Sequence, residues 1–205
     1  MKVRTKARQE AIIEAAATLF QEFGYEGASM NELAKRLGGS KTTLYGYFPS
    51  KEALFTAVVR SFATVHLSEA VLALPATVDD QAELELVLLR FAQRVLHVLT
   101  NDTRALAINR MVVAEAGRSE VGELFYEAGP SECLATLAEL LSASMDRGLL
   151  RRSDPHVAAL QLLSLITAEV DVRMYQRNPP PMTIPSIRKI AKRGVDMYLA
   201  GAARH

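Results

Sequence analysis

The chain has 205 residues, of which 49% are hydrophobic and 23% charged, and its formal net charge is +1. The apolar fraction excludes a disordered chain, and the length allows one or two domains. The single cysteine, Cys133, excludes an internal disulfide framework and favours a reducing compartment. The charge excludes a uniformly basic protein, but it leaves room for a local basic patch.

Basic charge is concentrated towards the N-terminus. Residues 1–60 carry nine lysines or arginines and six glutamates, a net charge of +3, whereas the rest of the chain has a net charge of −2. Residues 1–8 alternate basic residues without an apolar face, which predicts either a flexible basic arm or a frayed, solvated terminus. They lack the apolar region of a signal peptide, and the longest apolar run, 157–168, is too short to cross a bilayer. We therefore expect a cytoplasmic protein with no membrane partner.

Two helices are predicted before residue 38. Apolar residues at helical spacing indicate a first helix over residues 8–23, which Gly24 ends. A second apolar stripe indicates a helix over residues 29–37, with Ser29 as its N-cap and Glu32 at the capping-box position. We expect the first helix to support the second and its successor from behind.

A tight glycine turn follows the second helix. Gly38 and Gly39 end that helix, because glycine adopts positive φ without steric cost, and Ser40 can cap a third helix over residues 41–47. Two short helices joined by such a turn form a helix-turn-helix, whose second helix enters the major groove of DNA. The N-terminal arm would then reach phosphates or the minor groove.

The third helix carries groups that suit DNA. A lysine and two threonines in its first turn match guanine edges and the thymine methyl group, and the following tyrosines and lysine suit phosphate oxygens. Gly46 in this helix either lets a phosphate approach the backbone closely, or lies in the last turn, where glycine does not lower the stability of the helix. The candidate DNA-binding residues are Ser29, Lys41, Thr42, Thr43, Tyr45, Gly46, Tyr47 and Lys51.

These residues belong to a longer signature. Residues 37–55, LGGSKTTLYGYFPSKEALF, resemble the DNA-binding signature of the TetR/AcrR transcriptional regulators, and the preceding helix matches as well. The family usually has a bulky aliphatic residue at the second turn position, where this chain has Gly39; this departure weakens the expectation of a rigidly held recognition helix. Residues 110–130, RMVVAEAGRSEVGELFYEAGP, are similar to the second-domain pattern of an AefR-like subgroup.

The rest of the chain predicts helices only. A long helix over about residues 50–74 ends before Pro75, and no segment shows the alternation of a strand. We expect an all-α fold: a three-helix helix-turn-helix domain over residues 1–52, and a helical effector-binding and dimerisation domain over residues 53–205. The long helix would bridge both domains and transmit movement. The later helices are expected over residues 79–99, 102–116, 120–128, 131–147, 154–174 and 186–199.

The helix over residues 154–174 is apolar around nearly its whole circumference, so it must be buried on two sides. One side would face the domain core and the other a partner subunit. The family resemblance implies a homodimer in which the last two helices pair with their symmetry mates. The candidate interface residues are Leu160, Leu163, Ile187, Ile190, Gly194 and Met197.

An effector pocket is expected among the helices of the second domain. Its candidate apolar lining, each member of which is more often plain core, is Phe91, Val95, Met111, Phe125, Leu137, Leu141 and Met174. Charged residues on apolar helices need partners when buried, so they would either serve as polar handles in the pocket or pair across the dimer. These residues are Glu115, Glu169, Asp171 and Arg173.

The four histidines are scattered, and the chain has no nucleophile elbow, P-loop or metal-ligand spacing, so we expect neither an enzyme nor a cofactor or metal site. The expected function is that of a ligand-responsive DNA-binding regulator. It would be a repressor that a small, largely apolar molecule releases from a palindromic double-stranded operator. The alternative is an architectural or constitutive DNA-binding protein without an effector.

Overall fold

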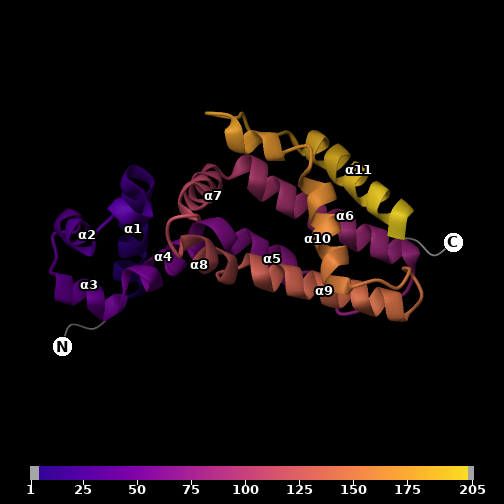
Figure 1. Ribbon diagram of the computed structural model, residues 1–205, viewed down its shortest axis with the longest axis horizontal. Helices are drawn as coiled ribbons and strands as arrows, with labels where there is room; N and C mark the ends of the chain where they lie inside the picture. The colour runs from indigo at the N-terminus through magenta and orange to yellow at the C-terminus, as the bar shows by residue number, and fades with distance from the viewer. Residues whose placement is uncertain (1–4, 203–205) are drawn as a thin grey trace. The chain divides into compact units, whose positions relative to one another are not determined.

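The computed structural model describes residues 5–202, except for the side chains of residues 63–67. The described residues form helices and connections without a strand, so the predicted all-α class is confirmed (Figure 1). The chain packs into two compact units. The N-terminal unit comprises Met1–Val65 and Ala107–Ala128, and the C-terminal unit comprises His66–Leu106 and Gly129–His205. Residues 107–128 thus pack with the helix-turn-helix, whereas the sequence assigned them to the second domain.

The N-terminal unit begins with the three expected helices. The third has the predicted bounds, because serine side chains cap its start and that of the next helix. The first continues past Gly24 as a kinked helix. The elements of this unit are α1 (Lys6–Gly27), α2 (Met30–Arg36), α3 (Lys41–Tyr47), α4 (Lys51–Val59), a π-helical turn (Arg60–Thr64), the second half of α7 (Thr103–Glu115), and α8 (Val121–Glu127).

Three aromatic rings form the centre of this unit. Phe20, Tyr25 and Phe55 are almost fully buried, and their ring centroids lie 5.1–5.8 Å apart. The Tyr25 hydroxyl donates a hydrogen bond to Oε1 of Glu52 at 3.2 Å. Burial, together with this nearby carboxylate, raises the pKa of Tyr25 well above its usual range. The phenol therefore stays protonated and keeps α1 joined to α4.

The kink in α1 is held by a carboxylate from α7. At Gly24 the backbone takes φ 70° and ψ 176°, so the helical hydrogen-bond ladder is interrupted. The Glu115 carboxylate accepts hydrogen bonds from the backbone N–H groups of Tyr25 at 2.7 Å and Glu26 at 3.2 Å. A Cβ at Gly24 would collide with Oε1 of Glu115. The positive φ therefore favours glycine here, and a Cβ would displace the Glu115 carboxylate from the kink.

In the C-terminal unit, α6, α10 and α11 lie side by side, and α9 packs against α10 (Figure 1). The predicted long helix continues from α4 through the π-helical turn into α5, whereas the helix predicted over residues 154–174 stops early and is followed by a separate 3₁₀ turn. The elements are α5 (Val65–Leu72), α6 (Gln81–Asn101), the start of α7, α9 (Pro130–Asp146), α10 (Pro155–Thr167), the 3₁₀ turn (Asp171–Tyr175), and α11 (Ile184–Ala202).

The core of this unit contains the single cysteine. Cys133 on α9 is 3% exposed, and burial raises the pKa of its thiol to about 12.

None of the described helices combines the length and the apolar character needed to cross a membrane.

Two glycines on α11 provide a matched test of this packing. A Cβ at Gly194 would lie 2.9–3.1 Å from backbone atoms of Leu165 and Ile166, so Gly194→Ala should push α11 away from α10 and destabilise the protein by about 1–3 kcal/mol. Gly201 has open space around it, so Gly201→Ala should be neutral or stabilise by at most about 1 kcal/mol. Thermal unfolding followed by circular dichroism measures both. Equal stability of the two variants would contradict the close approach.

The contact at the kink can be tested in the same way. Glu115→Ala leaves two backbone N–H groups without their acceptor and should destabilise the protein by about 1–3 kcal/mol. Glu115→Gln keeps one acceptor oxygen and should lose less. Glu127→Ala, at an exposed glutamate of α8, is the control and should unfold like the parent in urea. A loss no larger than that of the control would show that the carboxylate does not hold the kink.

Candidate nucleic-acid interface and ligand cleft

The recognition helix α3 is anchored by one buried residue and a capped start. Leu44 is 2% exposed and faces the core of the N-terminal unit. The Ser40 side chain accepts a hydrogen bond from the Thr43 backbone N–H at 3.1 Å, and the two hydroxyl oxygens lie 2.9 Å apart. These contacts fix the first turn of α3 and leave its opposite face outside.

The outer face of α3 carries three of the predicted residues. Lys41, Thr42 and Tyr45 are exposed, and none of them forms a hydrogen bond or ion pair within the described part of the chain. Their spacing places them on one side of the helix. The Thr43 hydroxyl, by contrast, is engaged with Ser40. Direct base contacts from the first turn therefore fit Lys41 and Thr42 better than Thr43.

The remaining predicted residues have other contacts within this unit. The Ser29 hydroxyl caps α2 by accepting the Glu32 N–H at 3.2 Å. The Tyr47 oxygen accepts the Thr5 N–H at 3.2 Å, so its own proton stays available for a phosphate. Lys51 Nζ lies 4.3 Å from the Tyr25 ring centroid and 3.4 Å from the backbone oxygen of Glu26. At Gly46 an added Cβ would meet nothing within 4 Å, so packing within the chain does not require this glycine.

The unusual glycine of the turn lies beside an arginine from α1. Arg8 donates from Nη2 to the Leu37 backbone oxygen at 3.2 Å, and a Cβ at Gly39 would lie 3.2 Å from the same nitrogen. Glycine thus leaves room for a guanidinium that ties α1 to the end of α2. The turn is held by this polar contact instead of by an aliphatic plug. Arg8 was expected to belong to a basic arm; Lys2 and Arg4 of that arm lie outside the described residues.

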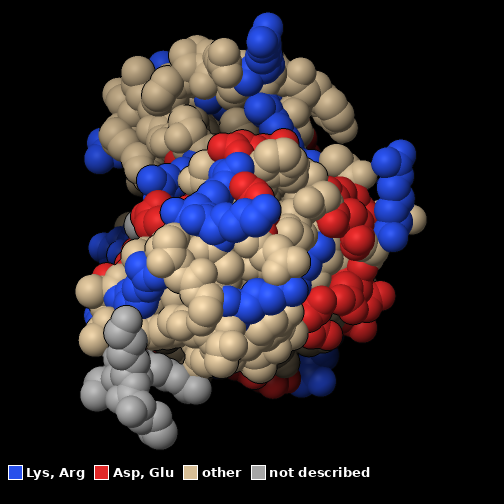
Figure 2. All heavy atoms as spheres, turned by 90° about the vertical axis from the view of Figure 1, so that its left-hand side faces the viewer, with Lys and Arg blue, Asp and Glu red and all other residues tan. Residues whose placement is uncertain are grey.

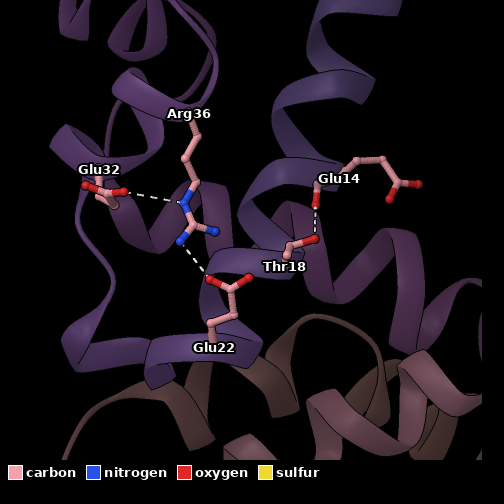
Figure 3. A network of polar contacts seen from close by, with 5 residues as sticks. All are labelled: Glu14, Thr18, Glu22, Glu32 and Arg36. Atoms are coloured by element: carbon pink, nitrogen blue, oxygen red, sulfur yellow. Dashed lines mark hydrogen bonds and ion pairs between the residues drawn. The ribbon is translucent and has the colours of Figure 1, made fainter.

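A second arginine joins α2 to α1. Nη2 of Arg36 lies 2.7 Å from Oε2 of Glu22, and Nε lies 3.5 Å from Oε1 of Glu32 (Figure 3). The hydrogen bond that Arg36 donates to Glu22 is the main cause that raises the pKa of Arg36. The guanidinium also lies 5.4 Å from the Phe23 ring centroid. Arg36 therefore positions α2 and is not a free cation of the DNA-facing surface.

Figure 2 shows the charges on the side where α2 and α3 lie in Figure 1. Lysine and arginine side chains are spread over this face from its left to its right edge, and acidic side chains gather towards the right and beside the central basic ones. Basic and acidic groups are thus mixed on this face. Phosphate binding needs only a local excess of basic side chains, such as the net charge of +3 on residues 1–60.

The C-terminal unit contains a cleft of about 1230 Å³. It is bordered by α5, α6, the start of α7 and the start of α11. Its apolar residues are Ala70, Leu72, Ala73, Leu74, Val87, Phe91, Val98, Ile184 and Ile187; its polar residues are Glu69, Arg90, Gln93, Arg94, His97, Asn101, Asp102, Thr103 and Arg104. Of the eleven residues predicted to line an effector pocket or to serve as its polar handles, only Phe91 lines this cleft.

The structure does not bring the other candidates together around one cavity. Three of them lie in the N-terminal unit: Met111, Glu115 and Phe125. Three are buried in the core of the C-terminal unit: Val95, Leu137 and Leu141. The last four follow α10: Glu169, Asp171, Arg173 and Met174. The first group includes the carboxylate that holds the α1 kink, so its charge is satisfied by backbone amides.

The charged residues after α10 have partners within the chain. Arg193 on α11 donates two hydrogen bonds to the Glu169 carboxylate, at 2.7 and 2.6 Å, and this pairing lowers the pKa of Glu169. Arg173 donates to the backbone oxygens of Thr100 and Pro180. These contacts connect successive elements of the unit, and neither charge lines the cleft.

The sequence reasoning missed the basic edge of the cleft. Arg90, Arg94 and His97 recur at i, i+4 and i+7 on α6, which is the spacing of one helix face. This periodicity is visible in the sequence. The pocket was predicted from the apolar stripe of α6 instead, and the residues of that stripe form the core.

The candidate dimer residues divide into two groups. Ile187, Ile190 and Gly194 are buried against other helices of the same chain. Leu163 is partly buried against the same core. Leu160 on α10 is 45% exposed and Met197 on α11 is 64% exposed, so these two side chains are available for a partner.

Comparison with known proteins agrees with this arrangement. The family model of bacterial regulatory proteins of the tetR family matches residues 12–58, and the model of the AefR-like transcriptional repressor C-terminal domain matches residues 86–201. The regulator RutR of Escherichia coli strain K12 is 44% identical over 62 residues, which span 30% of this chain and only 29% of RutR.

Two solved structures match over nearly the whole chain. The flavonoid-responsive regulator FrrA has a TM-score of 0.78 and 31% identity, and the match covers 98% of this chain and all of FrrA. A TetR-family regulator from Mesorhizobium loti has a TM-score of 0.75 and 30% identity, with the same coverage. The resemblance seen in the sequence is thus confirmed, and the chain belongs to the TetR family of bacterial transcriptional regulators, with an AefR-like C-terminal domain.

Proposed function

We propose that the protein is a ligand-responsive repressor that binds a palindromic DNA operator as a homodimer in the cytoplasm. A small molecule with a large apolar part would bind the C-terminal unit and release the operator. The observation that carries the proposal is the exposed first turn of α3, where Lys41 and Thr42 project from a helix anchored by Leu44. Such a turn reads base edges in helix-turn-helix proteins.

Two observations support a ligand response. The cleft of about 1230 Å³ is large enough for a small organic molecule, since typical ligand sites enclose about 300–1,000 Å³. FrrA, which is 31% identical, is described as flavonoid-responsive. The match to an AefR-like repressor domain favours repression as the direction of control.

Two continuous helical segments connect the C-terminal unit, which contains the cleft, with the N-terminal unit, which contains α3. The helical run from Lys51 to Leu72 crosses the division between the units, and its π-helical turn lies just before that division. The helix α7 crosses it as well: Thr103 and Arg104 line the cleft, and Glu115 at the other end holds the α1 kink. A ligand that favours one position of α7 would act on α1 through Glu115. This would add to the movement expected along the long helix predicted over about residues 50–74.

Binding to DNA is tested with two variants of α3. Lys41→Ala should relax the preference at one guanine position by about 1–3 kcal/mol and lower the salt slope, because it removes both a base contact and a positive charge near the phosphates. Thr42→Ala should change the preference at a different base position by about 1–3 kcal/mol without changing the salt slope. The measurement is a gel-shift titration at two salt concentrations with an operator selected from random duplexes. Arg118→Ala, at an exposed arginine outside α2 and α3, is the control. Binding by both α3 variants at the level of this control would refute the assignment of α3.

The dimer is tested through its exposed apolar side chains. Leu160→Glu and Met197→Glu should each shift the protein towards monomers in analytical ultracentrifugation, because a charge would enter an apolar interface. Leu86→Glu on α6 is a matched control, since Leu86 is 46% exposed and Leu160 is 45% exposed. This control should remain dimeric. Dimers in all three variants would place the interface elsewhere.

A further inference from the structure

The lining of the cleft in the C-terminal unit combines two chemically different groups of side chains. One group is apolar and comes from α5, α6 and α11; among its members Phe91 and Ile187 are almost fully buried and belong to the core. The other group is basic and lies along α6, where Arg90, Arg94 and His97 follow one another at helical spacing. A ligand that fills this cleft must therefore present both an apolar body and a group that suits guanidinium donors.

The basic edge has donors to spare. Arg90 and His97 form no hydrogen bond or ion pair with any other described residue. Arg94 uses Nη1 to donate to the Glu69 backbone oxygen at 3.2 Å, which fixes its guanidinium between α6 and α5. A guanidinium has five N–H donors, so this single contact leaves Arg94 positioned and still able to bind an anion.

The charge of the cleft lining is positive on balance. Three arginines, Arg90, Arg94 and Arg104, line it together with two carboxylates, Glu69 and Asp102. Oδ1 of Asp102 already accepts the backbone N–H groups of Arg104 at 2.9 Å and Ala105 at 3.0 Å, as a cap of α7. That carboxylate caps the start of α7 and forms no ion pair with Arg90 or Arg94.

We infer that the cleft binds an amphipathic anion, such as an organic acid whose carboxylate lies against Arg90 and Arg94 and whose aliphatic or aromatic body lies against the apolar side chains of the lining. Carboxylates suit the planar donor pair of an arginine, and two guanidinium groups one helical turn apart can share one head group. This inference names the chemical class of the effector, and it rests on the proposed function only for the regulatory consequence of binding.

The test uses three probes with the same twelve-carbon chain: dodecanoate, 1-dodecanol and dodecyltrimethylammonium, each below its critical micelle concentration. Calorimetry on the full-length protein should show dodecanoate binding at least about tenfold tighter than the other two. The double variant Arg90→Gln/Arg94→Gln should lose about tenfold or more in dodecanoate affinity while its affinity for dodecanol stays unchanged. Arg90→Glu should shift the preference towards the cationic probe, which a purely structural role of this arginine would not do.

The control is Arg118→Gln, which removes an exposed arginine of the N-terminal unit and should bind dodecanoate like the parent. Circular dichroism checks that all variants keep their helical content. The inference is overturned if dodecanoate does not bind, if dodecanol or the cation binds as tightly, or if the double variant binds dodecanoate like the parent.

A gel shift with the selected operator separates this inference from the proposed function. If dodecanoate binds through Arg90 and Arg94 but leaves operator affinity unchanged, the anion site stands and ligand-controlled repression by this class fails. If a neutral or cationic molecule releases the operator while dodecanoate does not bind, repression stands and the anion inference fails. Release of the operator by dodecanoate in the parent, and not in the double variant, supports both.

Discussion

The N-terminal unit depends on a carboxylate that replaces a missing part of a helix. At Gly24 the backbone turns out of the helical region, and the N–H groups of the next two residues lose their regular acceptors. Glu115 supplies both acceptors from a position about ninety residues further along the chain. The Tyr25 N–H is partly buried and relies on this acceptor, so the end of α7 stabilises the bend of α1. Since the Tyr25 ring also belongs to the aromatic centre, the end of α7 helps to position that centre.

The helix-turn-helix shows how a polar contact can take over the role of packing. The family resemblance predicts an aliphatic residue at the second turn position, whereas Gly39 leaves space next to the guanidinium of Arg8. Arg36 adds a second polar link, from α2 to Glu22 on α1. The link between Arg36 and Glu22 is a partly exposed ion pair, so it responds to salt more than an apolar plug would. Packing of the aromatic centre is unaffected by salt in this way, and it keeps the unit folded.

Local signals made much of the fold readable from the sequence, and distant contacts did not. The bounds of α3 follow from two serine caps, and the capping role of Ser29 is also local. The continuation of α1 past Gly24 could not be predicted from the local sequence. The acceptor for the backbone N–H groups that follow the kink is Glu115, which lies far along the chain. Likewise, the apolar residues suggested for a pocket, Leu137 among them, are core, since periodicity alone does not distinguish a core face from a cavity wall. The basic edge of α6 was readable as a pattern, but it resembles a solvated helix face until α5 is placed beside it.

The buried thiol of Cys133 can report on local unfolding of the C-terminal unit. Cys133 reacts only as a thiolate and only when solvent reaches it, and burial opposes both conditions. Alkylation at neutral pH therefore proceeds through transient opening of the C-terminal helices, and its rate measures how often these helices separate. The single cysteine lies in the C-terminal unit, so the alkylation rate does not respond to local unfolding of the DNA-binding helices. The opening of the C-terminal unit can thus be followed by mass spectrometry on the unaltered protein.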